Sequence, residues 1–207
     1  MIDGSRILDN QEHSVADHLR DNLWGADVFR LVSAYFSIYG YELLAEVLNS
    51  VGEVRFLFGD PGSVGEVDPG RKDPKTFSLT EQGNLAPKHV LRQKALALAC
   101  AQWIGSDRVK VRSISRSNFL HGKMYLTDGA SSGTAVVGSS NFTQSGLGGG
   151  FRPNLEINLA TSDANTHDEL REWFDKLWRD RNLTADVKQE VLDALARIGQ
   201  EQAPEFI

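Results

Sequence analysis

A histidine and a lysine, His121 and Lys123, stand one residue apart in the segment FLHGKMYLT. Alternate side chains of a strand face the same way, so both would share a face with Tyr125, opposite Met124 and Leu126. Because Met124 and Leu126 are the side chains expected to be buried, His121 and Lys123 are predicted to lie together on a polar surface. An imidazole can attack phosphorus or protonate a leaving oxygen near neutral pH, and an ammonium can stabilise charge that develops on a phosphate.

The next apolar segment, TAVVGSSN, carries polar groups that could complete such a site. Alternation predicts Val137, Ser139 and Asn141 on one face, and a hairpin through DGASSGT would place this strand beside the first. A hydroxyl and an amide would then join the imidazole and the ammonium. This set of groups suits a tetrahedral phosphate, whose oxygens accept hydrogen bonds from such donors.

A histidine near a lysine can also belong to an ordinary surface strand, and two further residues favour a site instead. Gly138 would allow the backbone to approach a ligand closely. Glu156, in the segment NLEINL, could accept the proton on the far ring nitrogen of His121 and hold the imidazole in one tautomer. The predicted catalytic residues are therefore His121, Lys123, Ser139, Asn141 and Glu156.

Positive charge is concentrated around this segment, although the chain as a whole has a net charge of −6. The stretch from Arg108 to Thr127 holds five lysines and arginines and no carboxylate, so it carries +5 and the rest of the chain −11 (−6 minus +5). Phosphate binding depends on the local field more than on the sum of charges. Three arginines that flank the motif are predicted to bind phosphates of the substrate: Arg112, Arg116 and Arg152.

Other kinds of site find little support in the sequence. His13, His18, His89 and His167 lack the spacing of metal ligands, so we expect no metal site and no cofactor. Cys100 lies in the apolar segment ALALACAQWI and is expected in the core. No apolar run is long enough to span a bilayer, so we expect a cytoplasmic protein with no membrane partner.

The pattern of elements indicates an α/β fold. A strand in ADVFRLVSAYFS, a helix with apolar residues at helical spacing and a strand in GEVRFLFGD suggest a parallel unit. A loop covering residues 60–82, a helix from about 87 to 104 and four strands up to NLEINLATS follow, and two helices with apolar stripes close the chain. We expect one domain over residues 1–200, and a tail or the start of a linker over residues 201–207.

The residues His121-x-Lys123, Asp128 and Gly138-Ser139-x-Asn141 resemble the HKD motif of the phospholipase D superfamily, and Glu156 stands where the family has an acid. Nine residues separate Asp128 from Gly138, against about six in the family, which predicts a longer hairpin turn. More of the chain, including SAYFSIYGYELLAEVL and VRFLFGDP, resembles phospholipase D-like domains at the N-terminus of some bacterial helicases. The resemblance implies a mixed sheet flanked by helices on both faces, followed by C-terminal helices.

The resemblance also implies a mechanism. Family members cleave or transfer phosphodiesters without a metal, and a complete site holds two HKD motifs. This chain has one motif and no internal repeat. We therefore expect a homodimer, in which His121 of one subunit forms a phosphohistidine and His121 of the other protonates the leaving oxygen. Two histidines in opposite protonation states would give a bell-shaped pH profile.

Three functions remain open at this stage. The favoured one is a metal-independent nuclease that acts on nucleic acid, with DNA as the expected substrate, and that can be attached to a helicase region. The second is a catalytically silent DNA-binding and dimerisation module of a helicase. The third is a lipid phosphodiesterase. The chain has no Walker A pattern, so any ATP-driven activity would lie in another region.

Overall fold

The computed structural model describes residues 4–58, 87–114, 120–129 and 133–200. The segment 60–82, Arg116 and the tail 201–207 lie outside the described residues, so the expectations for them are not addressed by the structure.

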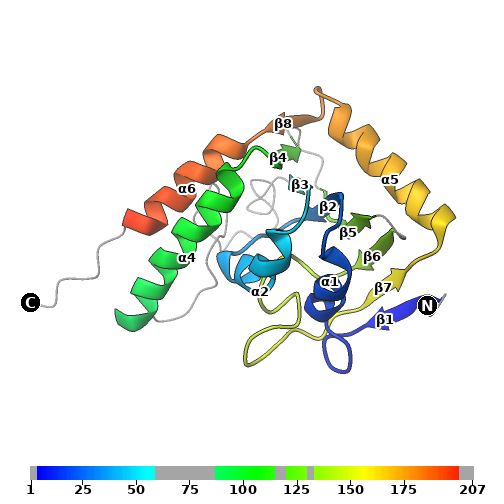
Figure 1. The fold of residues 1–207 in the computed structure, drawn as a ribbon, viewed down its shortest axis with the longest axis horizontal. Coiled ribbons are helices and arrows are strands. Elements are labelled where there is room, and N and C mark those ends of the chain that lie inside the picture. The colour runs from blue at the N-terminus through cyan, green and yellow to red at the C-terminus, as the bar shows by residue number, and fades with distance from the viewer. Residues whose placement is uncertain (1–3, 59–86, 115–119, 130–132, 201–207) are drawn as a thin grey trace, which may run out of the picture.

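The described residues form one mixed sheet with the strand order β1-β7-β6-β5-β2-β3-β4-β8 (Figure 1). The strands β2, β3 and β4 are parallel, and the other neighbours are antiparallel. The predicted strand-helix-strand parallel unit is thus confirmed as β2, α2 and β3. The strands are β1 (Arg6–Leu8), β2 (Val28–Ser33), β3 (Glu53–Phe58), β4 (Val109–Ile114), β5 (Lys123–Asp128), β6 (Thr134–Gly138), β7 (Asn158–Thr161) and β8 (Thr184–Asp186).

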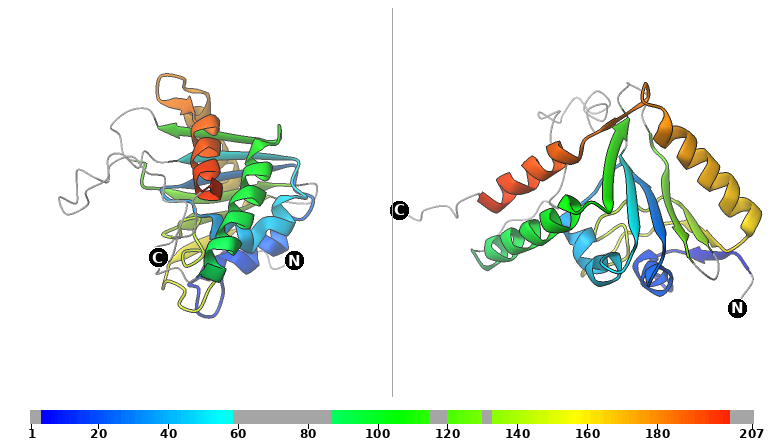
Figure 2. Two further views of the ribbon diagram at one scale, coloured as in Figure 1. Left: turned by 90° about the vertical axis from the view of Figure 1, so that its left-hand side faces the viewer. Right: turned by 45° about the horizontal axis from the view of Figure 1, so that its top comes forward.

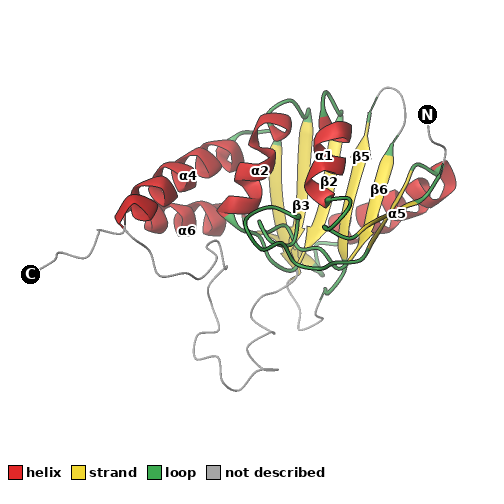
Figure 3. Cartoon of the chain, turned by 90° about the horizontal axis from the view of Figure 1, so that it is seen from below, coloured by secondary structure: helices red, strands yellow, loops and turns green. Residues whose placement is uncertain are grey.

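Helices cover both faces of the sheet, as predicted, with α1 and α2 over one face and α5 over the other (Figures 2 and 3). The helix α4 packs against α6, and the pair extends away from the sheet. The helices are α1 (Val15–Leu23), α2 (Ile38–Leu48), α4 (Pro87–Gly105), α5 (Ala164–Arg179) and α6 (Lys188–Gln200). None of the described helices is long and apolar enough to cross a bilayer.

Two apolar cores hold these layers together. The larger core lies on the side of α1, α2 and α4 and contains Phe29, Phe56 and Tyr125. The smaller one lies under α5, where Phe174 packs with Met124. Because side chains alternate along a strand, neighbouring residues of β5 contribute to different cores. The expected stripe of the C-terminal helix α5 is confirmed except for Trp173, which is exposed.

Serine side chains begin two of the helices. Ser14 accepts a hydrogen bond from the backbone N–H of Asp17 at 3.0 Å, which confirms it as the N-cap of α1. Ser37 does the same for Gly40 at 3.1 Å and starts α2. Each cap satisfies a backbone donor that has no partner within its helix. The Ser37 cap fixes where the chain turns from β2 into α2, next to the sheet edge described below.

The strand register brings the predicted site segments to one edge of the sheet. Val32, next to the end of β2, pairs with Met124 near the start of β5. Lys123, the first residue of β5, pairs with Gly138, the last residue of β6. The start of β5 and the ends of β2 and β6 therefore lie side by side, at the lower edge of the sheet in Figure 3.

Candidate active site

His121 and Lys123 lie in contact at this edge. The Lys123 ammonium donates a hydrogen bond to the His121 carbonyl oxygen at 3.0 Å, and Nζ is 3.3 Å from Nδ1 and 3.4 Å from Nε2 of the ring. His121 is exposed and precedes the strand, whereas Lys123 is only 6% exposed. The expectation that both lie on a polar surface is therefore wrong for Lys123. Alternation was read correctly, but both faces of β5 are covered by helices.

Burial changes the acid–base character of Lys123. Removal of the ammonium from water lowers its pKa below the ordinary value of 10.5, and the negative charge of Glu156 partly opposes this change. A cation at this position faces little competing water, so its interaction with a bound phosphate would be stronger than at an exposed site. The sequence placed Lys123 in the site, but only the structure shows this burial.

Ser139 and Glu156 form a second pair. The Ser139 hydroxyl donates a short hydrogen bond to Oε2 of Glu156, and Asn154 Nδ2 donates to Oε1 at 3.0 Å. The backbone N–H of Ile157 in turn donates to Ser139 Oγ at 3.0 Å. These contacts orient the carboxylate beside the strand edge. The role that the sequence suggested for Glu156, as the partner of the His121 ring, stays a prediction.

Asn141 is oriented by the end of β2. Its Oδ1 accepts hydrogen bonds from Ser33 Oγ and from the backbone N–H of Tyr35, each at 3.3 Å. Ser33 is fully buried and also accepts from the backbone N–H of Phe142 at 2.9 Å. The amide oxygen of Asn141 thus faces these donors, which turns its NH₂ group away from them. Sequence reasoning missed Ser33, whose only signal is a serine at the end of an apolar strand.

The way in which Ser139 and Asn141 reach the site differs from the prediction. Val137 pairs with Met124, so it lies on the α5 face, opposite to Lys123 and Tyr125. The strand β6 then ends at Gly138, and strand alternation no longer fixes the side chains that follow. The hairpin itself is confirmed by the antiparallel pairing of β5 with β6.

Gly138 is required by the neighbouring strand. A Cβ atom at this position would lie 2.3 Å from the carbonyl oxygen of Ile157 and 2.4 Å from Oδ1 of Asn158. Such distances are shorter than real Cβ atoms tolerate, so the absence of a side chain lets the chain before β7 approach. Gly138 thereby sets the distance between the strand that carries Ser139 and the segment that carries Glu156.

A buried polar network supports the segment around Ser140. Asn158 Nδ2 donates to Ser140 Oγ at 2.9 Å and to the Leu8 carbonyl at 3.1 Å, and its Oδ1 accepts from the Ser140 N–H at 3.2 Å. Tyr125 donates to the Ser140 carbonyl at 2.8 Å, and burial raises the pKa of its hydroxyl. Every one of these buried groups has a hydrogen-bond partner. The network holds Ser140 in place and thereby positions its chain neighbours Ser139 and Asn141.

The structure does not place Arg112 with the site residues. Arg112 lies on β4, three strands from β5 in the sheet order, and its register partner Leu57 belongs to the α5 face. Its guanidinium donates to Thr184 Oγ1 at 3.0 Å and to the Thr184 carbonyl at 2.7 Å, and lies over the ring of Trp178. These contacts give it a structural role, so the structure lends no support to its predicted part in substrate binding.

Arg152 is exposed in the loop that leads from Ser139 to Glu156. Its guanidinium carbon lies 6.0 Å from the ring centre of Phe151, which is also exposed. The loop passes through Gly148 and Gly150, both with positive φ, which favours glycine. Arg152 is therefore available to an incoming anion on the same loop as Glu156.

Asp128 lies at the other end of β5 from Lys123. Its carboxylate forms a short ion pair with Arg30, which is buried on β2, and Arg30 also contacts Asp175 on α5 at 3.2 Å. Asp175 is 3.3 Å from Arg55 as well. Asp128 therefore belongs to a structural ion network at the end of β5 that lies away from the site.

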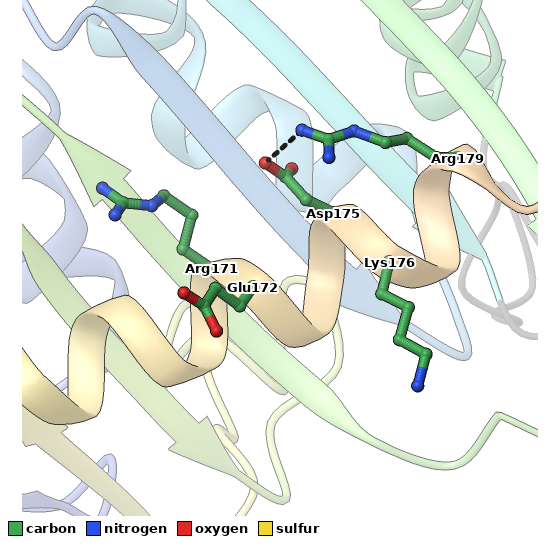
Figure 4. Close-up of a pocket in the computed structure, with 5 residues that line it drawn as sticks. All are labelled: Arg171, Glu172, Asp175, Lys176 and Arg179. Carbon is green, nitrogen blue, oxygen red and sulfur yellow. Dashed lines mark hydrogen bonds and ion pairs between the residues drawn. The ribbon is translucent and has the colours of Figure 1, made fainter.

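A surface pocket runs along α5, on the opposite face of the sheet from Lys123. Its lining residues come from this helix alone: Arg171, Glu172, Asp175, Lys176 and Arg179 (Figure 4). Asp175, which could otherwise attract a cation there, is paired with three arginines. This pocket is separate from the predicted catalytic residues and holds none of them. Within the described ranges, no group of three or more His, Cys, Asp or Glu side chains is arranged to hold a metal ion.

Comparison with known protein families identifies the class of this domain. Residues 44–178, about two thirds of the chain, match the family described as "Cardiolipin synthase, PLD-like domain". The matched region contains every predicted catalytic residue from His121 to Glu156. The chain belongs to this family of phospholipase D-like domains, and it has the phospholipase D-like phosphodiesterase fold.

Several solved structures resemble this chain. Phosphatidylserine synthase of Haemophilus influenzae is 14% identical, with a TM-score of 0.55, over 95% of this chain and 45% of that protein. Polyphosphate kinase of Porphyromonas gingivalis is 9% identical, with a TM-score of 0.48, over 86% of this chain and 21% of the kinase. Yeast tyrosyl-DNA phosphodiesterase is 12% identical, with a TM-score of 0.42, over 76% of this chain and 31% of that protein. The chain thus spans less than half of these proteins. No match was found among curated protein sequences.

Proposed function

We propose that the protein is a metal-independent phosphodiesterase that acts on nucleic acid, with DNA as its substrate. The observation that carries this proposal is the contact of the buried Lys123 ammonium with His121, at an edge where Glu156, Ser139 and Asn141 gather. A nucleophile, a cation and hydrogen-bond donors are the groups that phosphoryl transfer requires.

In the proposed reaction, a ring nitrogen of His121 attacks phosphorus. The bond to the leaving oxygen breaks, and the His121 imidazolium of a second subunit gives that oxygen a proton. Water then attacks the phosphohistidine and passes a proton to the second imidazole, which restores both rings. Lys123 and the amide of Asn141 stabilise the non-bridging oxygens. The scheme requires a homodimer because each chain supplies one such histidine.

The preference for nucleic acid rests on charge. Arg116 stands five residues before His121 in the sequence, and Arg152 is exposed on the loop next to Glu156. Repeated phosphates along a strand would engage such side chains without regard to base sequence. A covalently attached helicase region would supply the substrate. The alternative is a catalytically silent module, which binds DNA and dimerises but does not cleave.

A lipid phosphodiester is the second candidate. It is supported by the description of the matching family, which names cardiolipin synthase, and by the fold that the chain shares with phosphatidylserine synthase. Both descriptions concern other proteins of the same fold, and a fold does not determine a substrate. The exposed Arg152, on the loop that carries Glu156, is what favours nucleic acid.

The decisive experiment measures DNA cleavage by the wild type, His121→Ala and His121→Asn in EDTA. We expect cleavage by the wild type alone, and a covalent phosphohistidine when the reaction is quenched in base. Thermal melting of each variant controls for folding. Equal, salt-dependent DNA binding by all three proteins without cleavage would identify the silent module. Release of headgroup from phosphatidylglycerol vesicles, with DNA left intact, would identify the lipid enzyme.

A further inference from the structure

The loop of residues 139–157 joins β6 to β7, and we call it the β6–β7 loop. It carries Phe151, which is 94% exposed, more than any other large apolar residue that the structure describes. A single exposed apolar residue is ordinary on a protein surface and by itself indicates nothing. Phe151 differs from such residues in how firmly its loop is held and in where the loop leads.

Backbone hydrogen bonds hold the β6–β7 loop in shape on both sides of Phe151. The N–H of Gly149 donates to the Gln144 carbonyl at 2.8 Å, just before Phe151 in the chain. The N–H of Asn154 donates to the Ser145 carbonyl at 3.0 Å, just after it. The exposure of Phe151 is therefore a property of the fold and does not come from a loose segment.

The β6–β7 loop packs on the side of the sheet that carries Lys123. An added Cβ at Gly149 would lie 2.5 Å from Cδ1 of Leu43 on α2, so the loop passes close to this helix (Figure 1). The helix α2 covers the face of Tyr125, and Lys123 shares that face because it stands two residues before Tyr125 on β5. The loop and the proposed catalytic cation are thus on the same side of the sheet.

The chain keeps Phe151 within reach of the candidate active site. Asn154 Nδ2 donates to Oε1 of Glu156 at 3.0 Å, and Oε2 of Glu156 accepts the short bond from Ser139. Phe151 precedes Asn154 by three residues, which span at most about 11 Å when fully extended. A nucleotide that touches Phe151 would therefore be a near neighbour of one whose phosphate lies beside Glu156.

Arg152 adds a positive charge beside the ring of Phe151. Its guanidinium carbon lies 6.0 Å from the ring centre, at the outer limit of a cation–π contact. A nucleotide joins an aromatic base to an anionic phosphate, and these two side chains offer an aromatic ring and a cation at the same spacing in the chain. Proteins that bind single strands combine positive charge along the backbone with aromatic rings on which bases stack.

We propose that Phe151 and Arg152 bind one nucleotide of a single strand, with Phe151 stacked on its base and Arg152 in contact with a phosphate. The inference rests on the proposed function and narrows its substrate to single-stranded nucleic acid. In a duplex a base is already stacked and paired, so it would have to leave the stack to reach the ring. Every base has a π face, so the site selects a single strand and not a base sequence.

A membrane surface is the other setting in which a phenylalanine beside an arginine binds. Binding to a bilayer interface grows with the apolar area that becomes buried. The residues immediately around Phe151, which are Gly150 and the stretch from Arg152 to Asn154, add no second large apolar side chain. One ring is enough for one base but supplies little area for a bilayer, so a base is the better occupant.

Binding measurements test the stacking site. Fluorescence anisotropy of a labelled single strand compares His121→Asn, which lacks the proposed nucleophile, with the same protein carrying a further substitution. We expect Phe151→Ala to raise the Kd about 5- to 150-fold, as for the loss of one stacked base, and Phe151→Trp to keep it. Trp24, a 59% exposed aromatic residue at the end of α1, is the matched control, and Trp24→Ala should change nothing.

Two further DNA probes separate stacking from charge. A duplex of the same sequence and a single strand of abasic sugars present phosphates but no free base, so Phe151→Ala should leave both affinities unchanged. The slope of log K against log salt should also stay the same, because no charge is removed. An equal loss for all three probes, or no loss for the single strand, would overturn the stacking site. Circular dichroism checks that each variant folds.

Photocrosslinking locates the contact independently. A strand that carries 5-iodouracil links, upon irradiation, to an aromatic side chain stacked on that base, and mass spectrometry identifies the linked peptide. We expect the link at Phe151, its retention in Phe151→Tyr and its loss in Phe151→Ala. Links confined to other residues would contradict the assignment.

Cleavage and vesicle assays distinguish this site from the proposed function. A wild type that binds single strands through Phe151 but does not cleave them would keep the stacking site and refute the nuclease. Cleavage and single-strand affinity that are both unaffected by Phe151→Ala would refute the site alone. Sedimentation with phosphatidylglycerol vesicles that depends on Phe151, while single-strand binding does not, would assign the loop to a membrane and overturn the proposal.

Discussion

The ammonium nitrogen of Lys123 lies 3.3 Å from Nδ1 of His121 and 3.0 Å from its carbonyl oxygen. A largely buried cation thus contacts an exposed imidazole at the edge of the sheet. The contact couples the position of the proposed nucleophile to the group that would stabilise the phosphate. It makes Lys123 the residue through which the site is tested most sharply.

Replacement of Lys123 by methionine keeps the volume of the side chain and removes its charge. We expect kcat for DNA cleavage to fall by about 10²–10³, as for the loss of one transition-state hydrogen-bond donor. Lys176→Met, on the exposed side of α5, is expected to cleave at the wild-type rate. Steady-state kinetics measure both variants, and a Lys123→Met enzyme with unchanged kcat would remove Lys123 from the mechanism.

The lowered pKa of Lys123 predicts the alkaline side of the pH profile. Burial depresses this pKa below 10.5, so the charge on the site is lost at a lower pH than for an exposed lysine. Glu156 opposes the effect, and Glu156→Gln is therefore expected to shift the alkaline limb to still lower pH. The residual activity of the variant, measured as kcat/KM against pH, reports this shift. Glu172→Gln on α5 should leave the limb where it is.

Arg152 is expected to contact one phosphate of bound DNA. Its replacement by alanine should weaken binding for all sequences alike and reduce the slope of log K against log salt by about 0.9. Arg197→Ala, at an exposed position on α6, serves as the control. Fluorescence anisotropy over a salt series measures the slopes. Equal slopes for wild type and Arg152→Ala would mean that this arginine does not face the substrate.

Gly138→Ala is expected to damage both stability and activity. The added Cβ would meet the backbone of Ile157 and the side chain of Asn158, so the two segments must separate. We expect the free energy of unfolding to fall by about 1–3 kcal/mol. At Gly105, by contrast, a Cβ would have no neighbour within 4 Å, and Gly105→Ala should be nearly neutral. Urea denaturation compares the two, and equal stabilities would show that β7 can move aside.

The carboxylate of Glu53 predicts a change of stability in acid. Hydrogen bonds from Arg55, with Lys110 nearby, lower the pKa of Glu53 from 4.5 to about 2. Its stabilising contribution is therefore present above pH 4.5 and is lost as the pH falls towards 2. Because Glu53 is partly solvated, Glu53→Gln should cost only about 1 kcal/mol at neutral pH. Chemical denaturation at several pH values should show that this difference in stability between the wild type and Glu53→Gln disappears in acid. Glu169→Gln should not differ from the wild type in stability.

Local patterns in the sequence determined much of this fold. Apolar periodicity located the C-terminal helices, and the short turn-forming segment between β5 and β6 predicted the hairpin that brings Lys123 beside Gly138. These features depend on residues close together in the chain, whose geometry is set by the helix and strand repeats. The residues of the candidate site could be named for the same reason.

Only the tertiary structure decided which of these residues are buried and what they contact. Helices on both faces of β5 bury Lys123, which alternation alone had placed on a polar surface. Arg112 is near His121 in the sequence, yet β4 lies three strands away from β5, and its guanidinium is held by Thr184. Strand order and the covering of each face arise from contacts between distant segments. For the same physical reason, the outward direction of Leu159 on β7 is fixed by the buried hydrogen bonds of Asn158 to Ser140 and Leu8, which lie far away in the sequence.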